Sequence, residues 1–223
     1  MMRAMRALRE LRSREAGLSL IELLIAIMLT GFLMTLGVWM FVAGTHSVSL
    51  AQSIDGGTRQ ASNGMNQVAR MIRAATPNPL ASPTPGNPLN APAIISASAT
   101  GLQFYAYVNL NGAESPVMVS YALTGTGILT ETQYPATSNT PGANGHWDFG
   151  TARPTRNLCN SIPASTTVFR YFNKAGTELL PATITNDTQK AAIASIQVTI
   201  TIQATGAANA VTLTNTIGMA NVG

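Results

Sequence analysis

An apolar run near the amino terminus constrains this chain more than any other feature. Leu18 to Ala43 is a stretch of 26 residues, and its only polar members are Ser19, Glu22, Thr30 and Thr35. At about 1.5 Å of rise per residue, a helix of this length covers roughly 39 Å, which exceeds the hydrocarbon core of a bilayer at about 30 Å. The sequence therefore predicts one membrane-spanning helix.

Most of the positive charge lies before this run. Five arginines and two glutamates give residues 1–17 a net charge of +3, out of +4 for the whole chain. The next basic residue after the run is Arg59. This asymmetry predicts a single-pass protein of the inner, cytoplasmic membrane, with its amino terminus in the cytoplasm and the body from about Thr45 outside. Because the body is nearly neutral, nucleic acid is not an expected partner.

Glu22 is the one charged residue inside the run. A carboxylate in a membrane segment is costly unless it has a partner, so its presence suggests a function. A second interpretation is that Glu22 lies only some 6 Å from the start of the helix and reaches the headgroups. A secretory signal peptide is a further alternative, with Val42, Ala43 and Gly44 as a loose cleavage site. Its apolar region is normally about 7 to 15 residues, so this run is too long.

Residues 17–24 read GLSLIELL and follow a short basic leader. A glycine at the end of such a leader, a carboxylate five residues later and an immediate apolar stretch resemble the class III signal of type IV prepilins and type II secretion pseudopilins. The family usually has Phe where this chain has Leu18. Glycine suits the position before the scissile bond because its backbone enters a narrow cleft without a side chain.

The resemblance implies cleavage after Gly17 by a prepilin peptidase and methylation of the new amino terminus at Leu18. It also implies that Glu22 pairs with the amino terminus of a neighbouring subunit and sets the register of assembly. A paired carboxylate and ammonium offset part of each other's desolvation cost. The implied partners are prepilin peptidase, other pilins or pseudopilins in a filament, an inner-membrane assembly platform and membrane lipid.

A second helical segment is expected to follow the membrane span. Ile54, Thr58, Ala61, Met65, Val68, Ile72 and Ala75 follow a 4-3 spacing that places them on one helix face. Gly56 and Gly57 together cost about 2 kcal/mol of helix propensity, so we expect a kink or break near Gly56. Six prolines between Pro77 and Pro92 then predict a linker.

The remaining residues, 93–223, predict an antiparallel β head against which the amphipathic helix packs. Strand patterns occupy residues 102–109, 117–123, 167–173, 195–203 and 211–217. The segment 168–180 also resembles a minor pilin or J-type minor pseudopilin, in which a strand, a glycine turn and a short strand precede the last hairpin. The expected fold class is α+β and pilin-like. The expected divisions are a leader 1–17, a membrane and filament-core helix 18–45, an amphipathic helix 46–76, a linker 77–92 and the head.

Within the head, residues 135–165 are expected to form an irregular loop. His146, Trp147 and Asp148 in this loop form a possible contact surface, since functional groups often lie on loops. In the alternative interpretation, Trp147 packs the loop onto the head. Cys159 is the only cysteine, which excludes an intrachain disulfide and a cysteine-based zinc site.

The chain shows no catalytic motif, and we expect no enzymatic activity, cofactor or metal. Its size, its lack of a cysteine pair and its retained Glu22 favour a minor pilin or pseudopilin of a type IV pilus or of a type II secretion or competence pseudopilus. Two rival hypotheses remain. One is an extracytoplasmic enzyme tethered by its helix, and the other is a filament-tip protein for adhesion or DNA uptake.

Overall fold

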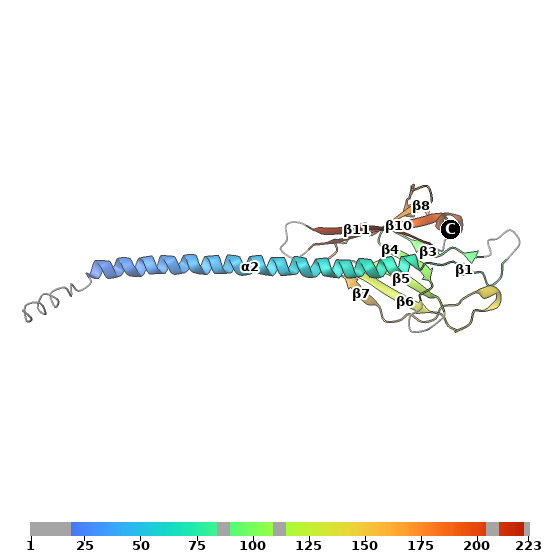
Figure 1. The fold of residues 1–223 in the computed structure, drawn as a ribbon, viewed down its shortest axis with the longest axis horizontal. Coiled ribbons are helices and arrows are strands. Elements are labelled where there is room, and N and C mark those ends of the chain that lie inside the picture. The colour runs from blue at the N-terminus through green and yellow to red at the C-terminus, as the bar shows by residue number, and fades with distance from the viewer. Residues whose placement is uncertain (1–18, 84–89, 109–114, 204–209, 221–223) are drawn as a thin grey trace, which may run out of the picture. The chain divides into compact units, whose positions relative to one another are not determined.

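The computed structural model describes residues 19–83, 90–108, 115–203 and 210–220. Two compact units meet between Ser49 and Leu50. The N-terminal unit contains the first part of one long helix, α2 (Leu20–Arg73), and the C-terminal unit contains the rest of α2 and every described strand (Figure 1). A long N-terminal helix followed by antiparallel β-sheets confirms the α+β, pilin-like architecture.

The helix α2 is continuous over 54 residues, so the expected kink near Gly56 is wrong. Tertiary packing explains the glycine at position 57, because a Cβ atom there would lie 3.1 Å from Cγ2 of Ile202 in the sheet, whereas a Cβ atom at Gly56 would have no neighbour within 4 Å. The missing side chain allows a close approach, and such contacts override weak helix propensities. An ion pair between Asp55 and Arg59 at 2.7 Å also spans this turn.

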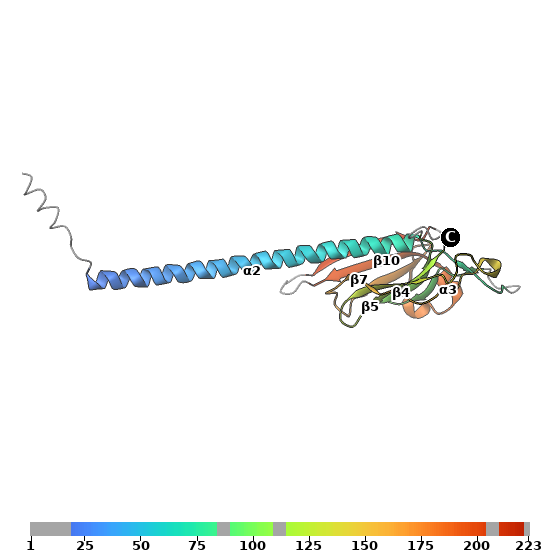
Figure 2. The same cartoon turned by 90° about the horizontal axis from the view of Figure 1, so that it is seen from below.

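The amphipathic face of α2 lies where its spacing predicts. Ala61, Met65, Val68 and Ile72 are all buried, as is Ala75 just beyond the end of α2, while Ile54 and Thr58 at the start of the face are half-buried. The buried face is wider than the predicted stripe, because it also contains Gly64, Ala69 and Met71. Seen from below, the sheets lie on one side of this part of the helix (Figure 2).

Five antiparallel strands form a meander in the order β3-β4-β5-β6-β7. Their bounds are β3 (Ile94–Ala97), β4 (Gly101–Ala106), β5 (Val117–Leu123), β6 (Leu129–Pro135) and β7 (Arg156–Cys159). In β4, β5 and β6, buried residues alternate with half-buried ones along most of each strand, as expected for a sheet with one face on the core.

A second sheet has four antiparallel strands in the order β11-β10-β8-β9. Their bounds are β8 (Phe169–Asn173), β9 (Glu178–Leu179), β10 (Ile193–Ile202) and β11 (Val211–Gly218). The predicted strands at 117–123, 195–203 and 211–217 match β5, β10 and β11 closely, and the other two begin or end within three residues of β4 and β8. The strand, glycine turn and short strand expected at 168–180 are β8, Gly176 and β9.

Several short elements lie outside the predicted pattern. A two-stranded pair, β1 (Asn78–Pro79) and β2 (Asn90–Ala91), occupies the proline-rich segment, and β7 lies within the range expected to be irregular. The remaining described elements are the 3-10 helices η1 (Ala143–Gly145) and η2 (Pro181–Thr183) and the helix α3 (Asp187–Ala191). All are too short for a periodic signal.

Aromatic side chains join the two sheets into one core. The rings of Phe104 and Tyr121 lie 6.1 Å apart, and those of Tyr121 and Phe169 lie 6.3 Å apart, all three being buried. The hydroxyl of Tyr171 in the four-stranded sheet donates to the carbonyl of Ser98 at 2.8 Å, beside the start of the five-stranded one. Burial raises the pKa of Tyr171 above its usual range.

A buried carboxylate fixes α2 to the five-stranded sheet. The side chain of Glu131 on β6 is fully buried. It accepts hydrogen bonds from Gln67 on α2 at 2.9 Å, from the Tyr121 hydroxyl at 2.9 Å and from Gln133 at 2.8 Å. A guanidinium nitrogen of Arg156 lies 3.7 Å away. Burying a charge is tolerable only with such partners.

Burial, and then the charge of Glu131, raise the pKa of Tyr121 well above 10.0. The folded state therefore favours the neutral hydroxyl. Because this pKa is raised on folding, the associated stabilisation is complete below about pH 10 and is lost as the pH rises further.

Removing the Tyr121 hydroxyl tests this network. We expect Tyr121→Phe to lower the free energy of unfolding by about 1 to 3 kcal/mol, because one bond to a buried carboxylate is lost. Tyr134→Phe is the matched control on the neighbouring strand, with an expected change within about 0.5 kcal/mol. Denaturant unfolding of the full chain in detergent measures both, and equal losses would contradict the assigned role of Glu131.

Candidate functional site

The predicted processing residues, Gly17 and Leu18, lie outside the described residues. The described chain begins at Ser19, immediately before the first residue of α2. The geometry available for the signal is therefore that of Ser19, Glu22 and the apolar helix that follows.

Ser19 and Glu22 form a reciprocal pair at the start of α2. The backbone N–H of Ser19 donates to Oε2 of Glu22 at 3.1 Å, and the backbone N–H of Glu22 approaches Oγ of Ser19 at 3.4 Å. This is the arrangement of a capping box, which satisfies backbone donors that a helix start leaves unpaired. The carboxylate also lies where the helix dipole favours negative charge. Glu22 thus has an intramolecular partner before any neighbour is present.

This role of Ser19 was not predicted from the sequence. Its signal was present, since a Ser followed three residues later by a Glu before an apolar run is the pattern of a capping box. The other polar members of the run are satisfied within the helix. The hydroxyls of Thr30 and Thr35 each donate to the carbonyl four residues earlier, Ala26 and Gly31, at 2.7 Å.

The apolar surface of α2 is uncovered within the described chain. The exposed large side chains include Leu20, Ile21, Ile27, Met28, Phe32, Leu33, Met34, Trp39, Met40 and Phe41. Among the described residues, α2 is the one helix long and apolar enough to cross a membrane, and its most apolar window is 0% buried. A surface this large and apolar marks contact with lipid or with other proteins.

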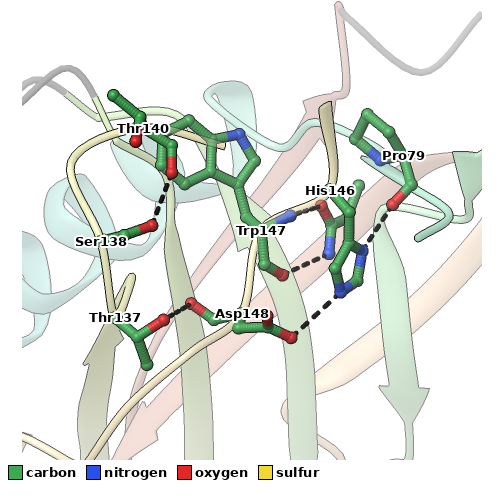
Figure 3. Close-up of polar contacts among 8 residues, drawn as sticks. Pro79, Thr137, Ser138, Thr140, His146, Trp147 and Asp148 are labelled. Carbon is green, nitrogen blue, oxygen red and sulfur yellow. Dashed lines mark hydrogen bonds and ion pairs between the residues drawn. The ribbon is translucent and has the colours of Figure 1, made fainter. Parts of the chain in front are cut away.

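The three loop residues of the other candidate surface lie just after η1. The imidazole of His146 has Nδ1 at 2.7 Å from the carbonyl oxygen of Pro79 and Nε2 at 3.1 Å from Oδ1 of Asp148 (Figure 3). Both ring nitrogens therefore face acceptors. A neutral imidazole has one donor, so it serves one of these acceptors at a time.

The backbone of Trp147 is fixed by two hydrogen bonds to the side chain of Asn78. Asn78, which is only 4% exposed, donates its amide N–H to the carbonyl of Trp147 at 3.0 Å and accepts the N–H of Trp147 at 3.0 Å. The backbone carbonyl of Asp148 in turn accepts the N–H of Thr137 at 2.9 Å. The structure thus brings His146, Trp147 and Asp148 together on segment 78–79. The sequence analysis missed Asn78, since one Asn between two prolines carries no distinctive pattern.

Other candidate groups offer little chemistry. Cys159 is buried, and this raises the pKa of its thiol to about 11, so the reactive thiolate is scarce at neutral pH. The described residues contain no group of three or more potential metal ligands. An open depression of about 580 Å³ beside Met219 is lined mainly by apolar groups, with Lys174 as its one charged residue.

Comparison with known proteins gives a match for the segment that contains Ser19 and Glu22. A family model described as the prokaryotic N-terminal methylation motif matches residues 12–38. The segment is a type IV prepilin-like signal. Such a signal implies processing by prepilin peptidase and assembly with other pilins, and proteins that carry it are generally structural. No curated protein and no solved structure shows a significant match to the chain.

The match covers the span from the end of the basic leader into the middle of the apolar run. It therefore contains Gly17, Leu18, Ser19 and Glu22 together. This supports a pilin-like or pseudopilin-like role and a membrane-anchored chain. It includes no residue of the loop around His146.

The anchoring of the loop gives a direct test. We expect Asn78→Ala to accelerate hydrogen exchange at the Trp147 amide at least tenfold, because two backbone groups lose their partner. Asn157→Ala is the matched control, since Asn157 is an exposed residue of β7. Residue-resolved exchange of the full chain measures both variants. Unchanged protection of Trp147 in Asn78→Ala would contradict this anchoring.

Proposed function

We propose that this chain is a minor pilin or pseudopilin, a structural subunit of a type IV pilus or of a type II secretion or competence pseudopilus. The leader is cleaved after Gly17, Leu18 becomes the methylated amino terminus, and α2 carries the subunit from the membrane into a filament. The match of residues 12–38 to the methylation motif is the observation that carries this proposal.

The uncovered helix supports assembly through hydrophobic contact. Burial of apolar surface stabilises by about 25 cal/mol per Å², so a helix that exposes so many large side chains gains much from either lipid or neighbouring helices. When α2 moves from lipid into a bundle of helices, it exchanges one apolar environment for another. Side-chain packing between the helices then determines how they are arranged. In this mechanism α2 supplies affinity, whereas Glu22 supplies register.

The capping box gives Glu22 a defined starting state. Its carboxylate is held by the N–H of Ser19 at the start of the helix, and Ser19 directly follows Leu18 in the sequence. In the assembled state we propose that it binds the ammonium group of a neighbouring Leu18. A charged partner forms a stronger hydrogen bond than the neutral backbone N–H of Ser19.

Several features favour a minor subunit. A single cysteine, buried in the core, leaves the head without the terminal disulfide typical of major type IVa pilins. Glu22 is retained, whereas K-type tip pseudopilins normally lack this carboxylate. The loop with His146, Trp147 and Asp148 remains a possible contact surface. Because its backbone is fixed to segment 78–79, we interpret it first as part of the packed head.

Intact mass analysis tests the processing. We expect the chain isolated from cells with prepilin peptidase to lack residues 1–17 and to carry one added methyl group on Leu18. Gly17→Glu is the matched variant and is expected to retain the leader, because a charged side chain before the scissile bond blocks entry to a narrow cleft. Retention of the leader by the unaltered chain would instead favour a tethered extracytoplasmic enzyme, whose helix is only an anchor.

Two substitutions separate the roles of Glu22. Glu22→Gln keeps an acceptor for the Ser19 N–H, because Gln is accepted at this capping-box position, but removes the charge. Glu22→Ala removes both. We expect normal cleavage and at least tenfold less incorporation into sheared filaments for both variants. Ser19→Ala, which retains the charge, is expected to assemble nearly normally. Normal assembly of Glu22→Gln would show that capping matters and pairing does not.

A further inference from the structure

The strand β11 forms an open edge of the four-stranded sheet. It is eight residues long and pairs on one side with β10. The pairing is regular from Ser195 opposite Gly218 to Ile202 opposite Val211, without a bulge. Such an edge presents a straight row of backbone donors and acceptors.

The register shows which backbone groups point outward. The Met219 N–H donates to the Ala194 carbonyl at 3.1 Å, so this opposed pair is a hydrogen-bonded one. Hydrogen-bonded and non-bonded pairs alternate along antiparallel strands. Leu213 and Asn215 therefore bond β10, whereas the N–H and C=O groups of Thr212, Thr214 and Thr216 point to the free edge. The Thr199 N–H donates to Val168 on the opposite side of β10, which agrees with this assignment.

Exposure confirms that the edge is open. Ile202, Ile200 and Val198 on β10 are 4%, 0% and 0% exposed. Their partners on β11, at 211, 213 and 215, are only half-buried. Within the described residues, the outward backbone groups of Thr212, Thr214 and Thr216 accept or donate no hydrogen bond.

The other sheet edges of the two main sheets carry features that discourage pairing. β9 has two residues and lies beside the ion pair of Arg170 and Glu178. β3 has four residues and an irregular register, and β7 has four residues, an irregular register and Arg156. Short strands, bulges and charges are the usual protections of an edge. Residues 210–220, by contrast, contain no charged residue and no proline.

The outer face beside this edge is a ladder of hydroxyl groups. Thr201 and Thr212 approach at 3.1 Å, Thr199 and Thr214 at 3.4 Å, and Gln197 donates to Thr216 at 3.4 Å. The opposite face of the same strand carries Val211, Leu213, Asn215 and Ile217, of which three are aliphatic. A further strand would continue both faces if it alternated hydroxyl-bearing and aliphatic residues, since cross-strand pairs of like kind stabilise a sheet.

We propose that the β11 edge binds an extended, uncharged segment of another protein, which adds to the four-stranded sheet as an antiparallel fifth strand. Its backbone bonds Thr212, Thr214 and Thr216, and its side chains alternate between the hydroxyl ladder and the apolar face. Recognition by strand addition takes its affinity from main-chain hydrogen bonds and its specificity from alternate side chains.

A second copy of β11 does not fit this role. Antiparallel pairing of β11 with itself needs a two-fold axis perpendicular to the strand. Because β11 runs along the part of α2 within the same unit (Figure 1), that axis would direct these parts of the two α2 helices, from Leu50 to Arg73, oppositely. We expect chains that are inserted with one orientation to disfavour this arrangement. The argument against a second copy of β11 depends on the proposed membrane orientation. The observation that the β11 edge is open does not depend on it.

Residue-resolved hydrogen exchange of the full chain in lipid nanodiscs tests the edge. The probe is a synthetic peptide with the sequence SIQVTITIQ, which copies residues 195–203, the natural partner of β11. We expect it to slow exchange at the Thr212, Thr214 and Thr216 amides at least tenfold and to leave Leu213 and Asn215 unchanged. The control is the same peptide N-methylated at alternate residues, which cannot complete the ladder. Equal or absent slowing by the two peptides would overturn the proposal.

Two lysine variants provide the matched comparison. Thr214→Lys places a charge at the centre of the edge and is expected to weaken probe binding at least tenfold. Thr199→Lys places the same charge on the same face one strand inward, and is expected to weaken binding less than threefold. Equal effects would show that the probe binds the hydroxyl face rather than the edge, which contradicts strand addition.

A cysteine at the edge distinguishes a second copy from another protein. We expect Thr214→Cys to form no more disulfide-linked homodimer in membranes than Thr199→Cys, since Cys159 is buried in both. Selective homodimer formation by Thr214→Cys would show that β11 pairs with itself and would overturn the proposed partner. All three experiments use the uncleaved chain, so their outcome is independent of processing at Gly17 and of filament assembly.

Discussion

The apolar surface of α2 that the chain leaves uncovered is the constraint on which the rest of the structure depends. Between Leu20 and Val42 the described residues offer nothing to bury it, so the N-terminal unit has no core of its own. Such a surface needs lipid or other helices. The C-terminal unit differs, because it has a core of its own. There one face of α2 packs against two sheets, and the other face is exposed to solvent. One helix thus has an apolar part and an amphipathic part. The change from one residue pattern to the other near residue 50 marks the boundary between the two units.

Polar groups then decide how these apolar surfaces are aligned. Hydrophobic contact is non-directional, so it fixes neither the rotation of α2 on the sheets nor the stagger of neighbouring helices. Glu131 supplies direction within the head, because its oxygens are reached by donors from α2, β5 and β6. In the filament proposed above, Glu22 has the corresponding role at the start of α2, where it accepts the N–H of Ser19 in the single chain. Both proposals rest on the partners that a carboxylate needs when it leaves water.

Much of this arrangement follows from the sequence because it rests on periodicity. The 3.6-residue spacing from Ile54 to Ala75 predicts the buried face of α2, and the alternation from Ile196 to Ile202 predicts β10 and its wet face. Prediction failed where long-range contacts decide. The helix continues through Gly57, where Ile202 of β10 packs closely against it, and β7 forms because β6 offers an edge. Asn78 and Glu131 acquired their roles from residues far away in the sequence. The signal around Glu22 was readable because its chemistry is local.

The single buried cysteine has a consequence for how the head reaches its native state. Extracytoplasmic domains often depend on disulfides, which form only where an oxidant and an isomerase are present. Here the two sheets are joined by packed aromatic rings and by hydrogen bonds to Glu131 and Ser98. Folding of the C-terminal unit is therefore indifferent to the redox state of its surroundings. In the proposed topology, the head can complete its core as soon as the chain has crossed the membrane, without waiting for thiol oxidation.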